Sequence, residues 1–349
     1  MIKKVEGEMN GTKEMSKKHF IDSSILSEYL EKNIPEFSGP LKIEEFIGGQ
    51  SNPTYLLKTE NSSYVLRRKP PGVLLKTAHA VDREFEVISA LNKTNVPVPK
   101  AYIHCEDESL IGTEFFVMEY IDGTVIWDSH IPHGTEKDRF EIYSSMNETM
   151  ANLHSVDPFK VGLENFGKPG NYVARQVSRW TKQYRNSETE NISSMNNLID
   201  WLPKNLPSEK PTRLVHGDFS LTNVIVNTEN NKIASILDWE LSTLGDPVAD
   251  FSYHCLQYFI NPILSDPQKC KDLNIPDLNK YVEMYIENSE FKISESEWNT
   301  YMAFSMFKLA AILQGITGRV RDGTAAGKDA DKLFPQTVML ADLGWTFVE

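Results

Sequence analysis

The 349-residue sequence predicts an α+β protein of two lobes, a small N-lobe built on an antiparallel sheet and a larger, mainly helical C-lobe. Strand-like segments separated by turns dominate up to about residue 120, whereas long segments with helical periodicity occupy the remainder. Hydrophobic residues make up 40% of the chain, which is enough to form a core in each lobe. We expect a disordered leader at residues 1–20, the N-lobe at 21–118 and the C-lobe at 119–349.

The expected N-lobe is a meander of strands with one helix before it and another inside it. Ser23 and Ser24 are candidate caps for a first helix that runs to about Leu30. A second helix is expected over residues 81–91, because apolar residues recur there at helical spacing and the prolines that follow stop it. The expected strands are 41–47, 54–58, 64–68, 101–105 and 114–120.

The expected C-lobe contains long helices and one short hairpin. Two apolar runs, 224–226 and 233–237, flank an asparagine-rich turn and are typical of two buried strands. Asp246 before Pro247 is typical of a helix start. The expected helices are 137–153, 172–184, 247–258, 278–287, 295–315 and 333–343.

The composition and charge of the chain argue against several classes of protein. The net charge of −13 argues against nonspecific nucleic-acid binding, which needs a basic surface. No apolar run approaches the roughly 20 residues that span a bilayer, and none follows the N-terminal lysines as in a signal peptide, so we expect no membrane segment and a cytoplasmic location. Cys105, Cys255 and Cys270 have no paired spacing and are expected to be buried thiols. The oligomeric state stays open.

The most informative segment is 214–240, whose polar residues stand in the order that magnesium-assisted phosphoryl transfer needs. The loop around His216 and Asp218 is suited to present a carboxylate to an acceptor hydroxyl. Asn223 and Asp238 offer the oxygen ligands that Mg²⁺ prefers, and the expected hairpin would hold them side by side. Asp and Asn also serve as caps and turns, but the full order favours catalysis with ATP and Mg²⁺.

The first turn of the N-lobe is a candidate phosphate-binding loop. It contains Gly48, Gly49, Ser51 and Asn52, small residues that would let backbone N–H groups approach phosphate oxygens. The same glycines also suit an ordinary hairpin turn, so this evidence is weak by itself.

Arg67 on the third strand is the candidate phosphate anchor, because arginine keeps its charge and grips an oxyanion with two donors. Arg68 and Lys69 follow it and leave the register open. Glu84, on the expected second helix, is predicted to pair with Arg67, with Glu86 as the competing choice. A solvated basic strand end and a solvated helix face are the simpler alternatives.

Further candidates stand where the chain passes between the lobes and into the helices. Backbone groups of Glu119 and Tyr120 are expected to bind adenine. His154 and Asp157 end a predicted helix and are interpreted as structural rather than catalytic. Asp250, one turn inside the helix after Pro247, is a candidate to hold the catalytic loop by hydrogen bonds.

Residues 171–185 carry four basic and no acidic residues in a strongly acidic protein. Arg175, Arg179 and Lys182 recur at helical spacing, which gathers them on one face. Such a face would suit an anionic acceptor and repel a polycation, unless it is only a solvated face paired to carboxylates elsewhere. We therefore expect Arg175 and Arg179 on the acceptor side, together with Glu240.

Taken together, these motifs resemble the aminoglycoside phosphotransferase family, over roughly residues 40–320. The most specific string runs from Val215 through Asn223 to Asp238 and Glu240. The resemblance implies a bilobal protein-kinase-like fold, Asp218 as the base that accepts the hydroxyl proton, and magnesium ligands at the two positions named above. It also implies in-line attack on the γ-phosphate of ATP by a hydroxyl of a small molecule.

Within that family, several strings are similar to the kinase-like domain fused to acyl-CoA dehydrogenase family members 10 and 11. These strings are residues 48–55, 64–72, 175–180 and 314–316. The resemblance implies a hydroxyacyl-CoA as the phosphate acceptor.

Other classes of function remain open. The chain would be a nucleotide-binding regulatory or scaffold domain if it bound ATP without turnover, although Asp218, Asn223, Asp238 and a cation at Arg67 are all present. A metal-dependent hydrolase is disfavoured because no further ligand cluster stands beside His216. Protein kinase activity is disfavoured because no activation segment follows Asp238.

Overall fold

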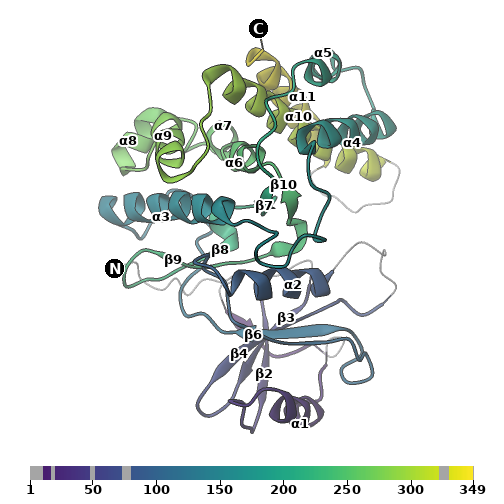
Figure 1. Cartoon of the computed structure of the whole chain (residues 1–349), viewed down its shortest axis with the longest axis vertical. Coiled ribbons are helices and arrows are strands. Elements are labelled where there is room, and N and C mark those ends of the chain that lie inside the picture. The colour runs from purple at the N-terminus through teal and green to yellow at the C-terminus, as the bar shows by residue number, and fades with distance from the viewer. Residues whose placement is uncertain (1–10, 17–19, 48–51, 73–79, 322–329, 349) are drawn as a thin grey trace.

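The computed structural model describes residues 11–16, 20–47, 52–72, 80–321 and 330–348. It has the expected α+β architecture of two lobes, with the sheet lobe at the bottom of Figure 1 and the helical lobe above it. No helix among those described is both long and apolar enough to cross a membrane.

The N-lobe is an antiparallel sheet in the order β1-β2-β3-β4-β6-β5, which buries β4 at its centre. On β4, Arg67 lies opposite Thr54 of β3 and Phe116 of β6. The strands match the predicted ones closely, apart from the additional β1. They are β1 (Thr12–Lys13), β2 (Lys42–Phe46), β3 (Thr54–Lys58), β4 (Ser63–Arg68), β5 (Ala101–Cys105) and β6 (Phe115–Glu119).

Helices α1 (Ser23–Asn33) and α2 (Val81–Leu91) cover opposite faces of this sheet, as Figure 1 shows. The N-cap of α1 is Asp22, whose carboxylate accepts from two backbone N–H groups, rather than the expected serines, which lie inside the helix. Helix α2 has the predicted bounds and lies between the sheet and the C-lobe, in contact with both.

The prediction of a disordered leader over residues 1–20 is wrong for its middle part. Thr12 and Lys13 form β1 and pair with the edge of β2, where the Thr12 hydroxyl donates to Glu44 at 2.6 Å. An edge strand offers unpaired backbone groups, and this short segment satisfies some of them. Residues 1–10 and 17–19 of the leader lie outside the described part of the chain.

The C-lobe is built around the long helix α10, which packs against α11, α4 and α6. The single helix expected over 247–258 is two, because i→i+3 hydrogen bonds around Cys255 and Leu256 tighten and turn the chain. Helices α5 and α8 were not predicted. The helices are α3 (Glu136–Ser155), α4 (Tyr172–Ser187), α5 (Ser193–Trp201), α6 (Pro247–His254), α7 (Gln257–Ile260), α8 (Pro267–Leu273), α9 (Leu278–Asn288), α10 (Glu295–Arg321) and α11 (Ala330–Thr346).

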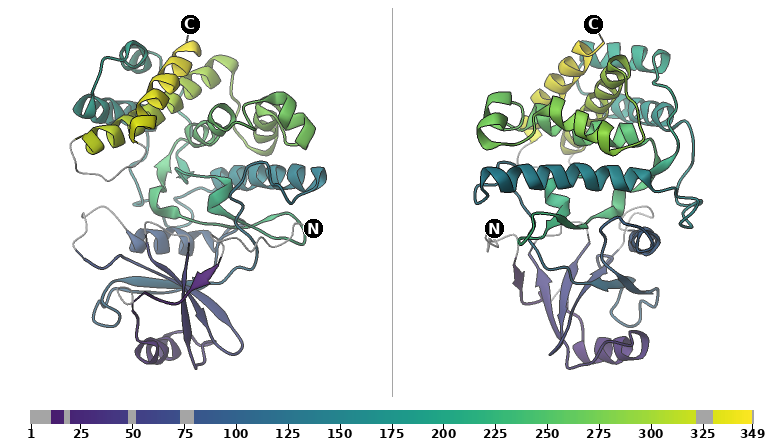
Figure 2. Two further views of the ribbon diagram at one scale, coloured as in Figure 1. Left: turned by 180° about the vertical axis from the view of Figure 1, so that it is seen from behind. Right: turned by 60° about the vertical axis from the view of Figure 1, so that its left-hand side comes forward.

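Four short strands lie on the side of the C-lobe that faces the sheet, with α3 running between them and the upper helices, as Figure 2 shows. The predicted hairpin is confirmed as β8 (Val224–Val226) and β9 (Ile233–Ile236). Strands β7 (Arg213–Val215) and β10 (Thr243–Gly245) form a second pair that was not predicted.

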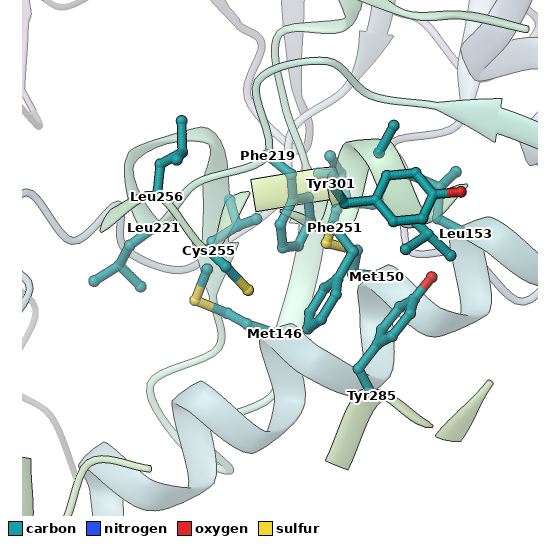
Figure 3. Close-up of a cluster of buried hydrophobic side chains, with 14 of the residues drawn as sticks. Met146, Met150, Leu153, Phe219, Leu221, Phe251, Cys255, Leu256, Tyr285 and Tyr301 are labelled. Carbon is teal, nitrogen blue, oxygen red and sulfur yellow. The ribbon is translucent and has the colours of Figure 1, made fainter. Parts of the chain in front are cut away.

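A cluster of buried aromatic and aliphatic side chains lies among the C-lobe helices next to these strands (Figure 3). It joins residues of α3, α6, α9 and α10 to Phe219, which follows directly on Asp218. Phe251 of α6 stacks on Tyr285 of α9 with ring centroids 3.8 Å apart. The three cysteines are buried free thiols, as expected.

Gly123 makes a close crossing between the segment after β6 and the β8 strand. A Cβ placed there would lie 2.4 Å from Ile225 Cγ2 and 2.6 Å from Val226 O. We expect Gly123→Ala to lower the free energy of unfolding by about 1–3 kcal/mol through overpacking, as measured by denaturant titration. The matched control is Gly315→Ala in α10, where the nearest atom of the described residues to an added Cβ is Arg319 Nη1 at 3.8 Å. This change should raise the free energy of unfolding by about 0.5–1 kcal/mol. Equal effects of the two changes would contradict this account.

Candidate active site

The loop between β7 and β8 carries Asp218 on a sharply turned backbone. Gly217 has a φ of +86°, and a Cβ there would lie 2.9 Å from Leu241 O, so glycine is required on both counts. The Asp218 N–H donates to His216 Nδ1 at 3.2 Å, and His216 Nε2 donates to Leu237 O at 2.9 Å. These bonds select one tautomer of His216 and hold the loop against the end of β9.

Asp250 of α6 holds the same loop from below, as the sequence predicted. Its two carboxylate oxygens accept from His216 N at 2.8 Å and Gly217 N at 2.9 Å. Buried His154 of α3 donates a further bond at 3.2 Å, and its other ring nitrogen bonds the Tyr285 hydroxyl at 2.7 Å. Burial opposes ionisation of Asp250, but these donors hold its pKa below the ordinary value. His154 is therefore structural, as interpreted.

Asp218 points out of the loop with solvent access to its carboxylate. Asn223 Nδ2 donates to its backbone oxygen at 2.8 Å and to its carboxylate at 3.0 Å. Partial burial raises the pKa of Asp218, against the opposing effect of His216 and the Asn223 hydrogen bond. A fixed carboxylate with a raised pKa is suited to accept a proton near neutral pH.

Asn223 and Asp238 lie side by side because Leu237 N donates to Asn223 O at 2.8 Å. The amide nitrogen of Asn223 is used by Asp218, which turns the amide oxygen away from that residue. Asp238 adopts a left-handed backbone with φ of 61°, an uncommon conformation for a non-glycine residue. An amide oxygen and a carboxylate are hard ligands that fit Mg²⁺.

Arg67 connects the sheet to this pair of residues. Its Nε lies 2.9 Å from Glu84 Oε2 and its Nη2 lies 2.7 Å from Asp238 Oδ1, which confirms the predicted pairing with Glu84. Asn52 is fully buried and donates to Glu84 at 2.8 Å. Glu86 is exposed.

The register left open at Arg67 is therefore settled by the neighbouring cations. Arg68 is buried on the other face, where it donates to Ile111 O at 3.0 Å, and Lys69 pairs with Glu114. Adjacent residues on a strand point to opposite faces, so Arg67 points at the C-lobe and Arg68 points away from it, while Lys69 lies just beyond the end of β4.

The other nucleotide candidates are placed only in part. Gly48, Gly49 and Ser51 lie outside the described residues. The Glu119 N–H donates to Lys100 O at 2.8 Å, so this N–H is already used within the protein. Tyr120 follows directly after β6, and its adenine-binding role stays a prediction.

The residues expected on the acceptor side lie in two separate parts of the structure. Arg175 donates to Lys168 O at 2.6 Å and Pro169 O at 3.4 Å, so it braces a loop, while Arg179 is exposed. Neither forms an ion pair with any residue that the structure describes. Glu240 lies near Arg67: burial opposes the charge of Arg67, but Glu84, Asp238 and Glu240 raise its pKa.

One cation near the site was missed. Lys308 of α10 lies with its Nζ 3.7 Å from the centroid of the Tyr253 ring, and the charge of Asp218 acts on it. The sequence did hold a signal, because Lys308 is the one charged residue in the otherwise uncharged run 301–318.

A family model described as "Phosphotransferase enzyme family" matches residues 42–268. The acyl-CoA dehydrogenase family member 10 of Mus musculus is 44% identical over 343 residues, covering 96% of this chain and 32% of that protein. The chain thus spans about a third of that relative's length.

Solved structures are similar across both lobes. A crystal structure from Ralstonia eutropha, described as a "putative aminoglycoside phosphotransferase", is 42% identical with a TM-score of 0.85, covering 94% of this chain and 98% of that chain. A thermostable mutant of an aminoglycoside phosphotransferase in ternary complex with AMP-PNP and hygromycin B is 13% identical with a TM-score of 0.59, covering 92% and 98%. At that identity the likeness concerns the fold alone.

Replacing Asp250 tests the support of the loop. Asp250→Asn keeps one oxygen and turns an NH₂ group toward a backbone donor, so we expect the free energy of unfolding to fall by about 2 kcal/mol or more. Because the pKa of Asp250 is lower in the folded protein than in the unfolded chain, its carboxylate stabilises the fold fully above about pH 4. This stabilisation is lost as pH falls through the pKa of Asp250 in the folded protein. The variant should lack that acid-dependent component.

The measurement is denaturant unfolding of both proteins between neutral and acid pH. Asp200→Asn, at an exposed position of α5, makes the same chemical change as a control and should leave stability within about 0.5 kcal/mol. Identical stability curves for Asp250→Asn and wild type would show that the loop does not depend on this carboxylate.

Proposed function

Because this chain belongs to the phosphotransferase enzyme family, we propose that it transfers the γ-phosphate of ATP to a hydroxyl of a small molecule with the help of Mg²⁺. The observation that carries the proposal is the joint placement of Asp218, Asn223 and Asp238. The side-chain amide of Asn223 donates through its nitrogen to Asp218, the candidate base. Asn223 also stands beside Asp238, the other candidate metal ligand. This arrangement would bring a proton acceptor and a metal site together at the base of the β8–β9 hairpin.

Arg67, Asn223 and Asp238 serve the nucleotide in this proposal. The oxygens of Asn223 and Asp238 would hold the metal, which supplies charge neutralisation for the phosphoryl group when it is bound. Arg67 lies against Asp238 and is held by Glu84, so its donors are oriented toward the place where phosphate charge gathers.

Asp218 takes the proton of the acceptor in this proposal. The hydroxyl oxygen forms a bond to the γ-phosphorus while its proton passes to the Asp218 carboxylate, and the bond between that phosphorus and the bridging oxygen of ADP breaks. The His216 and Asn223 hydrogen bonds hold Asp218 in one orientation, which lowers the entropic cost of the step.

The acceptor is proposed to be a hydroxyacyl-CoA or a related hydroxy acid. The name of the mouse relative, an acyl-CoA dehydrogenase family member, supports this class. The cations of α4 also support it, since Arg179 is exposed and lies on the same helix as Lys182 without an ion pair to the described residues. Positive charge attracts an anionic acceptor and repels a polycation.

The proposal is tested by ADP release from ATP with a panel of hydroxyacyl-CoAs, free hydroxy acids, aminoglycosides and choline, with and without Mg²⁺. We expect Mg²⁺-dependent stimulation by the acyl class alone. Stimulation by aminoglycosides or choline would overturn the acceptor class. ATP binding without turnover across the panel would favour the regulatory or scaffold alternative.

Asp218→Asn removes the proton acceptor and keeps the Asn223 contact sterically possible. We expect kcat to fall by about two to four orders of magnitude, the range for a positioned base, with ATP affinity unchanged. Isothermal titration with AMP-PNP checks the affinity. Wild-type turnover in this variant would rule out the assigned role.

The pH dependence provides a second test of Asp218. Its pKa is raised, so the wild-type rate should fall as pH decreases through a value above the ordinary Asp pKa of about 4, because protonation removes the base. The residual rate of Asp218→Asn should lack this acid limb. An acid limb shared by both proteins would assign it to another group.

A further inference from the structure

Lys308 is a half-buried cation without a carboxylate partner among the residues that the structure describes. Its ammonium group forms no ion pair or hydrogen bond within the described part of the chain, and its nitrogen lies 3.7 Å from the centroid of the Tyr253 ring. Removing a charge from water is costly unless other groups compensate for it, and a single ring face compensates only in part. The ammonium group of Lys308 can therefore bind a negatively charged oxygen of a ligand.

The charged groups around Lys308 indicate that its ammonium group lies on the acceptor side of the catalytic loop. Burial and the like charge of Arg179 lower the pKa of Lys308, while Asp250 and Asp218 act in the opposite direction. Asp250 is already committed to two backbone N–H groups and His154. Helix α6 connects Lys308 to the loop: Tyr253 holds the ammonium group, and the neighbouring His254 donates to the carbonyl of Phe219, the residue after Asp218, at 2.8 Å. Asp218 receives the acceptor hydroxyl in the proposed reaction, so Lys308 lies on the acceptor side of the loop.

Two packed helices bring these charges together. Helix α10 carries Lys308 and packs along α4, which carries Arg179, and α10 also packs on α6, which carries Tyr253. Arg179 is exposed and lies over the Trp180 ring, 5.4 Å from its centroid. Positive charge thus extends from the half-buried Lys308 outward along α4.

We propose that Lys308 is a specificity-determining residue whose ammonium group, held on the ring of Tyr253, binds an acyl oxygen of the phosphate acceptor while Asp218 receives its hydroxyl. That oxygen is the carboxylate of a free hydroxy acid or the thioester carbonyl of a hydroxyacyl-CoA. Arg179 favours the larger anionic thioester. The inference rests on the proposed phosphotransfer, and it assigns to Lys308 an acceptor oxygen next to the reacting hydroxyl, which is anionic in a hydroxy acid and partially negative in a thioester.

The same arrangement disfavours acceptors with an amine near the hydroxyl. An ammonium group placed beside Lys308 would meet a like charge in a site of reduced solvent access, which costs more than it would in water. Ethanolamine is therefore the matching cationic probe, with 3-hydroxybutyrate and 3-hydroxybutyryl-CoA as the two acyl probes.

The test compares wild type with Lys308→Met and Lys308→Arg by isothermal titration of each probe in the presence of AMP-PNP and Mg²⁺. Loss of one member of a bound charge pair should weaken acyl-probe binding about 10- to 100-fold in Lys308→Met. Lys308→Arg keeps the charge and should retain affinity within about threefold. AMP-PNP affinity and the thermal midpoint should stay unchanged in both variants. Lys93→Met, an exposed lysine of the N-lobe, is the control for loss of one charge.

Several outcomes would overturn the proposal. One is acyl-probe binding by Lys308→Met at wild-type affinity, and another is equal weakening of AMP-PNP with a lower thermal midpoint, which would mean a structural role. Binding of ethanolamine by the wild-type protein would also overturn the proposal. So would failure of the wild-type protein to bind either acyl probe. Binding is measured without turnover, so acyl binding that depends on Lys308 but yields no ADP would contradict the phosphotransfer alone. A larger loss for 3-hydroxybutyryl-CoA in Arg179→Gln would assign the thioester as the source of the oxygen.

Discussion

The buried carboxylate of Asp250 holds the catalytic loop in place, and the geometry of the C-lobe site follows from it. The loop backbone turns too sharply at Gly217 to satisfy its own N–H groups, and Asp250 accepts two of them. A buried charge is tolerated when donors surround it, and His154 supplies the third. Because α6 is packed into the core of Figure 3, the position of Asp218 depends on the packing of helices far from it in sequence.

Arg67 performs a comparable task between the lobes. One guanidinium group contacts Glu84 of α2 and Asp238 at the end of the β8–β9 hairpin, so the sheet and the segment with the candidate metal ligand share a single ion-pair network. Helix α2 lies between the lobes and contacts both. A change in the position of α2 would therefore move Arg67, the candidate phosphate anchor, and Asp238, the candidate metal ligand, together, which would couple lobe arrangement to the proposed nucleotide binding.

Local charge, rather than net charge, decides what approaches the site. The chain carries a net charge of −13, yet two cations, Lys308 and Arg179, lie on the side of the loop that would face the proposed acceptor. Electrostatic interactions weaken within a Debye length in physiological salt, so the nearest charges dominate the choice of acceptor. An acidic protein can in this way keep a site for anionic substrates.

The sequence by itself determined the features that depend on near neighbours. The bounds of α2, the β8–β9 hairpin and the placement of Asn223 and Asp238 at its two ends follow from periodicity and short spacing. Tertiary structure alone decided the register of Arg67, the break between α6 and α7, and the position of Lys308. Lys308 lies 90 positions beyond Asp218, and only the packing of α10 on α4 and α6 brings them together. Local patterns encode hydrogen bonding along the chain, whereas contacts between distant helices depend on how whole surfaces fit.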